Sequence, residues 1–401
     1  MNILMVLEGE FPPDERVEKE AISLISDGHQ VSIVCYTRTG KPAKEMYKGI
    51  RLYRMPISKI FFKLSAACLV FPVYFYLWRR FILSLFEEAV FDVIHVHDLP
   101  LSSVGYWFKR KFGTKLVCDQ HEYYSNWIIH TAHYNTPVGK IIKFLSNWTK
   151  YEKKYLSKAD LVITVEEPLR EIYINVVGLS AEKIICLPNA PSGKIFEGEN
   201  FDEEILSRFR NRFILFYAGG IDILRGLDVA IKSLPRLKNE IPDVMLLLCG
   251  KIVKPYNPID LADKLGVSDS VHFDGWSPIE KLPTYIKVSD ICLFTPPSNR
   301  DEINKTIATK IYQYLQMGKP VIVGQAKMMK EFVETNEIGY VINESSVDEF
   351  TDTVLKFYRN KESEEKRILQ NCRKIKTKYV WEGTVCKLLD NYKRMENLIL
   401  D

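Results

Sequence analysis

Short apolar runs alternate with longer amphipathic stretches along the first half of the chain. Because apolar runs of this length are typical of strands buried on both faces, the alternation predicts βαβ units and a parallel sheet covered by helices. The predicted strands are Ile3–Leu7, Val31–Tyr36, Ile50–Met55, Val93–His97, Lys115–Cys118, Leu161–Val165 and Ile184–Leu187.

The same pattern restarts after a polar, acidic stretch at residues 193–204. The predicted strands of this second half are Phe213–Ala218, Val244–Cys249, Val271–Phe273, Ile291–Phe294, Pro320–Val323 and Tyr340–Ile342. A chain of 401 residues is also too long for one ordinary core. We therefore expect two Rossmann-like domains, residues 1–192 and 193–379, followed by a helical tail at about 380–401.

Composition narrows the class of protein. The chain is 46% hydrophobic and 26% charged, which is typical of a globular protein, and its net charge of +4 is too small to indicate a nucleic-acid partner. Eight cysteines without a CxxC pair indicate buried thiols in a reducing compartment. The opening MNILMVLEGEF looks like a first strand rather than a signal peptide, so a cytoplasmic location is expected.

Polar residues gather just after the predicted strands, where open α/β sheets bind their ligands. In the second half Gly219, Gly220 and Arg225 follow one strand, and Gly250 and Lys251 follow another. The residues in the first half are His97, Asp98, Asp119, His121 and Glu122. The two sets are expected to line one cleft.

The segment from Ile291 to Gly324 reads as strand, polar loop, helix and second strand. Such a unit points a helix N-terminus at an anion, because backbone N–H groups are free there and the helix dipole is positive at that end. Lys305, Thr306 and Lys310 lie where they would complete a phosphate site.

The ordered motifs of the chain resemble a known family. They are FPPDERVEKEAISLISDGHQV, HVHD at 95–98, His121 after a strand, LPN at 187–189, YAGGIDILRG at 217–226, LLLCG, and YQYLQMGKPVIV. Together they are similar to family 4 of the retaining glycosyltransferases. The resemblance implies an α/β protein of the GT-B fold, with two facing Rossmann-like domains and a last helix that returns to the N-terminal domain.

The resemblance also implies roles for the two domains. The C-terminal domain would hold a nucleotide diphosphate sugar through Gly219, Gly220, Arg225, Lys251, Lys305, Thr306, Lys310 and Gln313, with Arg225 on the diphosphate. The N-terminal domain would present a glycan or lipid-linked acceptor, with His121 beside the transferred sugar and His97, Asp98, Asp119 and Glu122 lining the site. No DxD-like motif is found, so neither a metal ion nor a cofactor is expected.

One departure from the family divides the functional interpretation. Where most members carry two glutamates, this chain has Lys305 and Gln313; Glu302 lies three residues upstream of the first position. The first reading is an active, retaining hexosyltransferase of cell-surface polysaccharide or glycolipid synthesis. The second is a catalytically impaired scaffold that binds a sugar nucleotide. A sugar-nucleotide epimerase is a lesser alternative.

The segment 38–80 carries ten basic residues against one acid, Glu45, around an apolar run from Leu64 to Trp78 that Pro72 interrupts. The run is too short and too broken to span a bilayer. Basic residues flanking aromatic ones are typical of a segment on an anionic membrane surface, so peripheral association with the inner face of the membrane is one expectation. The alternative is a buried helix whose lysines reach solvent.

Overall fold

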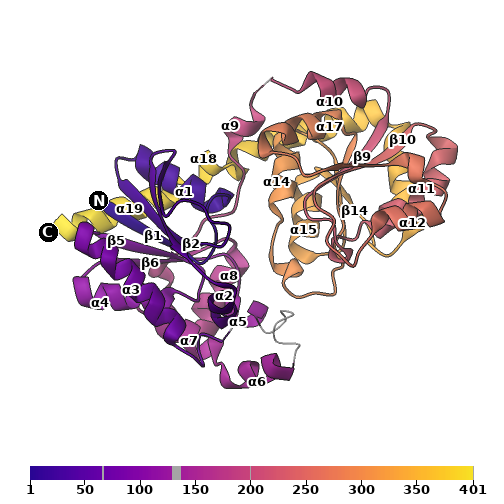
Figure 1. The fold of residues 1–401 in the computed structure, drawn as a ribbon. Helices are drawn as coiled ribbons and strands as arrows, with labels where there is room; N and C mark the ends of the chain where they lie inside the picture. The colour runs from indigo at the N-terminus through magenta and orange to yellow at the C-terminus, as the bar shows by residue number, and fades with distance from the viewer. Residues whose placement is uncertain (66, 129–136, 199, 401) are drawn as a thin grey trace. The chain divides into compact units, whose positions relative to one another are not determined.

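A computed structural model describes residues 1–65, 67–128, 137–198 and 200–400. The chain forms two compact units, each with its own sheet (Figure 1). Unit 1 comprises Met1–Asn189 together with Thr384–Asp401, and unit 2 comprises Ala190–Gly383.

Unit 1 is built on an eight-stranded sheet of order β3-β4-β2-β1-β5-β6-β7-β8. Its strands are β1 (Asn2–Leu7), β2 (Gln30–Thr37), β3 (Lys44–Tyr47), β4 (Ile50–Pro56), β5 (Val93–His97), β6 (Lys115–Gln120), β7 (Leu161–Thr164) and β8 (Ile184–Cys186). All the predicted strands are present, and every pairing is parallel except that of β3 with β4.

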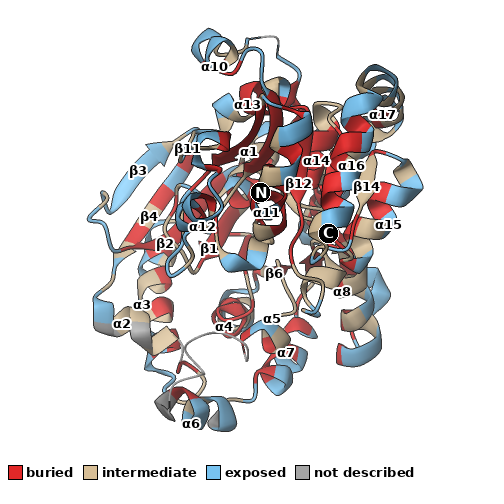
Figure 2. Ribbon diagram, turned by 90° about the vertical axis from the view of Figure 1, so that its right-hand side faces the viewer, coloured by how far each residue is buried: buried red, intermediate tan, exposed pale blue. Residues whose placement is uncertain are grey.

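The sequence did not predict β3. This strand lies at the sheet edge, and its sequence KEMY is almost fully exposed, so no buried face marks it as a strand (Figure 2). A tight turn at Lys48 and Gly49, both with positive φ, reverses the chain into β4.

Helices cover both faces of this sheet. They are α1 (Glu15–Ser26), α2 (Lys59–Ser65), α3 (Val73–Glu88), α4 (Ser102–Phe112), α5 (Tyr124–Trp127), α6 (Pro137–Leu145), α7 (Trp148–Leu156), α8 (Glu167–Ile172) and α19 (Cys386–Leu400). A Cβ on Gly105 of α4 would lie 2.7 Å from side-chain carbons of Val96 and Leu116. Because side chains alternate across a strand, Val96 faces α4 while His95 and His97 face the opposite side.

The C-terminal helix α19 belongs to unit 1, as the resemblance implied. In Figure 1 it runs beside the first elements of the chain. The Tyr392 hydroxyl lies 2.9 Å from Nδ1 of His95, and the Lys387 ammonium donates to the Cys186 carbonyl at 3.2 Å. The N-terminal amine donates to Glu396 at 3.2 Å. These polar contacts fix the last helix against β5, against β8 and against the residue that precedes β1.

Unit 2 has a six-stranded parallel sheet of order β11-β10-β9-β12-β13-β14. The strands are β9 (Phe213–Ala218), β10 (Val244–Cys249), β11 (Val271–Gly275), β12 (Ile291–Phe294), β13 (Val321–Val323) and β14 (Gly339–Val341). The helices are α9 (Gly193–Phe196), α10 (Glu203–Arg208), α11 (Asp228–Glu240), α12 (Pro258–Lys264), α13 (Leu282–Val288), α14 (Thr309–Gln316), α15 (Lys327–Asn336), α16 (Val347–Arg359), α17 (Lys361–Ile375) and α18 (Trp381–Thr384).

Both sheets are buried between their helices (Figure 2). The core strands β9, β10 and β12 carry almost wholly buried side chains, which is why they read as continuous apolar runs. Among the described residues, we find no helix whose length and apolar content match a membrane span.

Candidate functional site

The carboxyl ends of three neighbouring strands meet at one edge of the unit 2 sheet. Gly219 follows β9 with φ of +138°, and Gly250 follows β10 with φ of +149°. A Cβ on Gly250 would lie 1.8 Å from the Gly219 carbonyl oxygen. Glycine is therefore required for the two loops to approach each other, and the result is an edge where backbone is accessible. Gly220 has no heavy atom within 4 Å of its virtual Cβ.

Arg225 is held at this edge by a short local structure. Its Nε donates to a carboxylate oxygen of Asp222 at 3.2 Å, and its side chain is 37% exposed. The next residue, Gly226, has φ of +66°, and a Cβ there would lie 1.7 Å from the Thr295 carbonyl oxygen. The Thr295 hydroxyl donates to the Gly226 carbonyl at 2.9 Å. Gly226, which the sequence did not single out, therefore ties the Arg225 turn to the end of β12.

Lys310 brings a second cation to the same place from the first turn of α14. A Cβ on Gly219 would lie 3.4 Å from its Nζ atom, which also lies 4.3 Å from the ring centre of Phe294. Burial, and then the charge of Arg225, lower the pKa of Lys310 to about 7. No carboxylate lies within ion-pair distance of Lys310 among the residues that the structure describes. A half-buried amine without an acidic partner favours an anionic ligand, which stabilises its charged form.

The remaining predicted donor residues differ in how exposed they are and in the partners that they have. Lys251 is exposed after β10, and Thr306 ends a short helical turn with extended backbone angles. Gln313 is 8% exposed on α14. Lys305 forms an ion pair of 2.5 Å with Asp301, so its charge is already balanced by a neighbouring acid.

Two polar side chains fix the loop between β12 and α14. The Asn304 amide donates to the carbonyls of Ser298 and Arg300 at 2.7 and 2.9 Å. Glu344 accepts from the Ser298 hydroxyl at 2.6 Å and from the Gln325 backbone at 2.9 Å. The loop is therefore built into the unit before a ligand arrives. Glu302, which lies in it, is paired with Arg300 at 2.8 Å.

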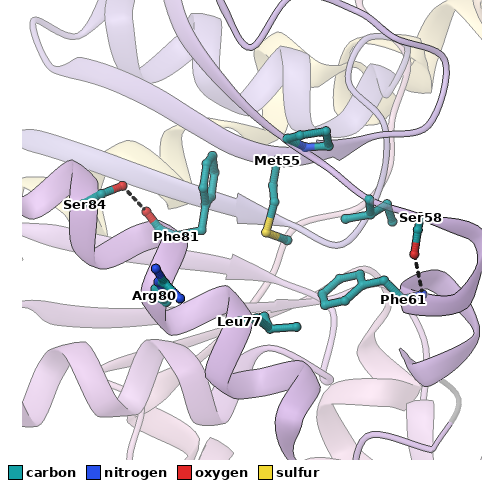
Figure 3. Close-up of a pocket in the computed structure, with 9 residues that line it drawn as sticks. Met55, Ser58, Phe61, Leu77, Arg80, Phe81 and Ser84 are labelled. Carbon is teal, nitrogen blue, oxygen red and sulfur yellow. Dashed lines mark hydrogen bonds between the residues drawn. The ribbon is translucent and has the colours of Figure 1, made fainter.

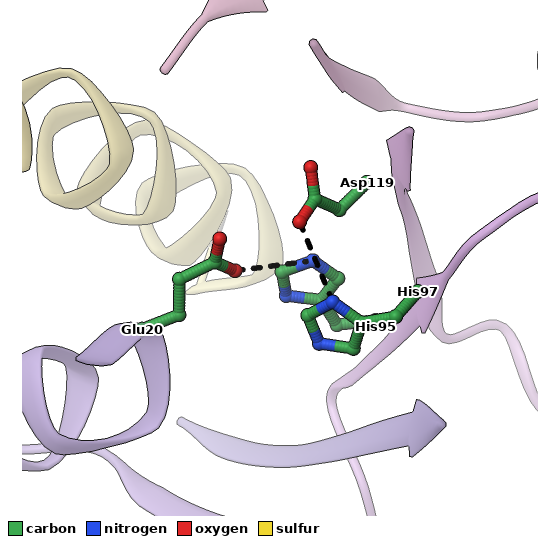
Figure 4. Close-up of side chains that lie close together, drawn as sticks. All are labelled: Glu20, His95, His97 and Asp119. Atoms are coloured by element: carbon green, nitrogen blue, oxygen red, sulfur yellow. Dashed lines mark ion pairs between the residues drawn. The ribbon is translucent and has the colours of Figure 1, made fainter. Parts of the chain in front are cut away.

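In unit 1 the polar residues of β5 and β6 face α1 rather than solvent. His95, His97, Glu20 of α1 and Asp119 of β6 are all buried, and one potential ligand atom of each lies within 4.8 Å of the others (Figure 4). His95 and His97 stack at 4.5 Å between ring centres. Histidine and carboxylate side chains of this kind are metal ligands in other proteins.

A cation of the chain itself already occupies this cluster. Arg16 donates through Nε and one terminal nitrogen to the two carboxylate oxygens of Asp119, at 2.8 and 2.9 Å, and its Nε lies 3.2 Å from Glu20. A third bond of 3.0 Å reaches the Leu187 carbonyl. Burial raises the pKa of Asp119, but the charges of Arg16 and His121 outweigh it and hold that pKa well below its usual range. These contacts make the cluster an internal ion-pair network.

His121 joins this network to the surface. Its Nε2 lies 2.9 Å from Asp119 and its Nδ1 lies 3.5 Å from Asp98, with 25% of the side chain exposed. Burial lowers the pKa of His121, but the charges of Asp98 and Asp119 outweigh this effect and raise it to about 10. Asp98 has φ of +62°, which non-glycine residues rarely adopt. His121 is therefore a positioned imidazolium at neutral pH.

Glu8 is a further polar residue at the strand ends of unit 1, beside His121 and Asp98, and it was not predicted from the sequence. It directly follows β1, which lies next to β5 in the sheet, and accepts a hydrogen bond of 2.6 Å from the Tyr74 hydroxyl. Burial raises the pKa of Glu8 and that of Glu122 to about 7, and the charge of Asp98 contributes to both. The rule that selected His121 and Asp98 would also have selected Glu8, because it too lies just after a strand.

Comparison with known proteins decides the family. The model described as Glycosyltransferase Family 4 matches residues 16–190, and the model described as Glycosyl transferases group 1 matches residues 199–374. The chain belongs to glycosyltransferase family 4.

Curated relatives of this family 4 glycosyltransferase share limited identity with it. A GDP-mannose-dependent alpha-(1-6)-phosphatidylinositol monomannoside mannosyltransferase of Mycolicibacterium smegmatis is 24% identical over 266 residues, which cover 64% of each chain. A D-inositol 3-phosphate glycosyltransferase of Thermomonospora curvata is 21% identical over 324 residues, covering 76% of this chain and 72% of the relative.

Solved structures show that the family 4 glycosyltransferase has the predicted GT-B fold. Sucrose-phosphate synthase from Thermosynechococcus elongatus matches with a TM-score of 0.75 and 15% identity, covering 99% of this chain and all of the other. The Anabaena protein HepE, solved in complex with UDP-glucose, matches with a TM-score of 0.71 and 16% identity, covering 98% and 99%. The prediction of the family and of its fold is confirmed.

The structure of this family 4 glycosyltransferase groups the predicted site residues unevenly. In unit 2, Gly219, Arg225 and Lys310 come together, whereas Lys305 is engaged by Asp301. In unit 1, His97 and Asp119 are fully buried, and both contact His121. Trp276, at the end of β11, is 76% exposed and is not a core residue.

Some basic residues of segment 38–80 form ion pairs with acids of unit 1. Lys44 pairs with Glu88, Lys48 with Glu18, and the fully buried Arg54 with Glu45. The apolar run becomes α2 and α3, with residue 66 outside the described residues; Tyr74, Phe75 and Trp78 are core residues, as the buried-helix alternative required. Phe71, Val73 and Tyr76 nevertheless remain 55–61% exposed.

Proposed function

We propose that this protein transfers a hexosyl unit from a nucleotide diphosphate sugar to a glycan or lipid-linked acceptor, with retention at the anomeric carbon. Unit 2 is the donor domain and unit 1 the acceptor domain. The observation that carries the proposal is the pair of cations Arg225 and Lys310 beside the Gly219 loop.

These cations suit a departing nucleoside diphosphate. When the glycosidic bond breaks, negative charge accumulates on the leaving phosphate, and preorganised positive groups stabilise it where it forms. Arg225 supplies a planar guanidinium that fits phosphate oxygens. The first turn of α14 has no capping side chain at Ala308. The Ile311 N–H donates to the Ala308 carbonyl at 2.9 Å, and the N–H groups before it in the turn suit the same phosphate.

The retaining mechanism fits the absence of a free carboxylate at the two family positions. Lys305 and Gln313 stand there, and the neighbouring Asp301 is tied to Lys305. A covalent glycosyl-enzyme would need a nucleophile at this place. We therefore infer front-face attack: the anomeric carbon–phosphate oxygen bond breaks, the acceptor oxygen bonds the same face, and its proton passes to the departing phosphate.

The relatives suggest donors and an acceptor class to test. One is named for GDP-mannose and a phosphatidylinositol mannoside, and HepE was solved with UDP-glucose. Exposed apolar residues in unit 1 support an acceptor presented at a membrane. They are Phe71, Val73 and Tyr76 near the start of α3, and Ile141 and Phe144 of α6. Peripheral association of the protein with the cytoplasmic face of the membrane would bring unit 1 to such an acceptor, in polysaccharide or glycolipid synthesis.

The test combines donor binding with turnover. Thermal unfolding is measured with UDP, GDP, ADP, UDP-glucose and GDP-mannose, because a ligand of the folded state raises Tm. Arg225→Glu should abolish the shift, whereas Lys356→Glu, an exposed change on α16, should leave it intact. An unchanged shift in Arg225→Glu would show that the donor lies elsewhere. Release of nucleoside diphosphate that depends on a lipid-extract acceptor then establishes transfer.

A second candidate is a sugar-nucleotide-binding scaffold without turnover. It is favoured by one observation, the replacement of both expected acids by Lys305 and Gln313, of which Lys305 is neutralised by Asp301. A donor-induced shift in Tm without any release of diphosphate, across donors and acceptors, would decide for the scaffold.

A further inference from the structure

Unit 1 contains a cavity of about 590 Å³ at the carboxyl end of β4 (Figure 3). The end of β4 and the following residues supply Met55 and Ile57, α2 supplies Phe61, and α3 supplies Leu77 and Phe81. All five side chains are half-buried, so the protein itself leaves their inner surfaces uncovered. The volume lies within the range of small-molecule binding sites.

The lining offers little to a polar ligand. Its two hydroxyls are already engaged, since Ser58 accepts from the Phe61 backbone at 3.1 Å and Ser84 donates to the Phe81 carbonyl at 2.8 Å (Figure 3). Specific recognition of a sugar requires several uncommitted donors and acceptors. An apolar wall with its hydroxyls occupied instead favours a hydrocarbon.

One charged group lines the cavity. Arg80 lies on α3 three residues after Leu77 and four before Ser84, the spacing that places side chains on one helix face. It is exposed, and no carboxylate lies within ion-pair distance of it among the residues that the structure describes. Arg80 therefore offers a cation at the edge of an apolar cavity.

Aromatic side chains connect the cavity to the polar residues at the strand ends of unit 1. Phe61, which forms part of its wall, lies 5.0 Å from the ring centre of Tyr74. The Tyr74 hydroxyl in turn donates to Glu8 at 2.6 Å, and Glu8 interacts electrostatically with Asp98. The cavity wall is therefore connected to Glu8 and Asp98 through the buried Tyr74.

We propose that this cavity binds the hydrocarbon chain of a lipid-linked acceptor, with Arg80 against the anionic phosphate of that lipid. The assignment rests on the proposed function, in which unit 1 presents the acceptor. The chain supplies apolar area that fits the five lining side chains. The phosphate pairs with Arg80, and the acceptor hydroxyl is directed toward the strand ends.

Binding is tested first, without catalysis. The probe is a long-chain lysophosphatidic acid carrying a diazirine in its chain, used below its micellar concentration. Leu77→Trp and Ser84→Met both fill the cavity, the second from an exposed position that burdens folding less. Each should weaken binding by about tenfold or more, equivalent to about 1.4 kcal/mol. Ser26→Met, which makes the same change as Ser84→Met at an exposed serine of α1 outside the cavity, should bind as the wild type does.

The phosphate contact has its own comparison. Arg80→Gln should weaken lysophosphatidic acid by about tenfold while leaving the matching monoacylglycerol unchanged, because only the former carries the charge. Lys111→Gln, which removes an exposed cation from α4, is the matched control. Photo-crosslinks should map to residues 55–61 and 77–84.

Two results would overturn the cavity assignment. One is equal binding by the cavity-filling variants and Ser26→Met, and the other is crosslinks confined to α6 or other surfaces. A separate outcome concerns the proposed function. Cavity-dependent lipid binding by a protein that transfers no sugar from any donor would retain the lipid site and reject the transferase.

Discussion

Arg16 of α1 binds both carboxylate oxygens of Asp119 on β6, at 2.8 and 2.9 Å, in a part of unit 1 where both side chains are almost fully buried. The pair anchors His121, whose Nε2 lies 2.9 Å from the same carboxylate. A helix from the start of the chain therefore orients the histidine that the family resemblance places beside the sugar.

Arg16→Met should destabilise the protein by about 3–5 kcal/mol, because it leaves the Asp119 carboxylate buried with its main partner removed. Urea denaturation followed by tryptophan fluorescence measures the loss. Lys44→Met breaks an exposed ion pair with Glu88 and should cost much less, because water screens the two charges. Equal losses in the two variants would mean that the Arg16 pair contributes no more than a surface pair.

His121→Gln should lower stability in a way that depends on pH. The pKa of His121 is raised from 6.5 to about 10 in the folded protein, so the protonated ring stabilises the fold. That stabilisation is fully present below the unfolded pKa near 6.5 and is lost as pH rises through about 10. The wild type and His121→Gln are denatured at pH 6, 8 and 10, and the difference between their free energies of unfolding should shrink toward pH 10. A difference that stays constant would contradict the imidazolium assignment.

Gly226→Ala should disrupt the donor site, whereas Gly266→Ala should cost about 1 kcal/mol. Both glycines have nearly the same backbone angle, with φ of +66° and +68°. They differ in space, since a Cβ on Gly226 would meet the Thr295 carbonyl at 1.7 Å and one on Gly266 meets nothing within 4 Å.

Thermal unfolding gives the stability of both glycine variants, and the UDP- or GDP-induced shift gives the integrity of the site. We expect Gly226→Ala to lower Tm more than Gly266→Ala and to lose the nucleotide shift. If the two variants behaved alike, the close approach of the Arg225 turn to β12 would not be needed.

Affinity for a nucleoside diphosphate should fall as pH rises above 7. The pKa of Lys310 is lowered to about 7 in the free protein, and a bound diphosphate stabilises its charged form, so binding takes up a proton. Between the free and bound pKa values the affinity should fall by up to about tenfold per pH unit. Calorimetric titration from pH 6.5 to 9 measures this slope, and Lys310→Arg should flatten it. A slope unchanged in that variant would assign the proton to another group.

Most of the fold follows from local patterns. The apolar runs at Phe213–Ala218 and Val244–Cys249 became strands with the predicted bounds, because continuous burial on both faces needs continuous apolar sequence. The edge strand at Lys44–Tyr47 escaped prediction because it buries no face. A strand without a buried face leaves no periodic pattern in the sequence.

The candidate site was harder to predict than the fold. Strand-end position was enough to select His121, Arg225 and the glycines, but it gave no partner for any of them. Lys305 lies at the expected place in the chain, yet its charge is balanced by Asp301 four residues earlier. Lys310, five residues later, is the lysine that lies unpaired beside the Gly219 loop.

The two α/β units, their family and the chain positions where ligands are expected could be read from the sequence, since these depend on periodicity and on motif order. Which charges meet became clear from the folded chain. Arg16 and Asp119 are 103 positions apart, and no local pattern relates them. Electrostatic energy depends on distance and burial in space, so the protonation of His121 and Lys310 became readable only once the sheets had brought their neighbours together.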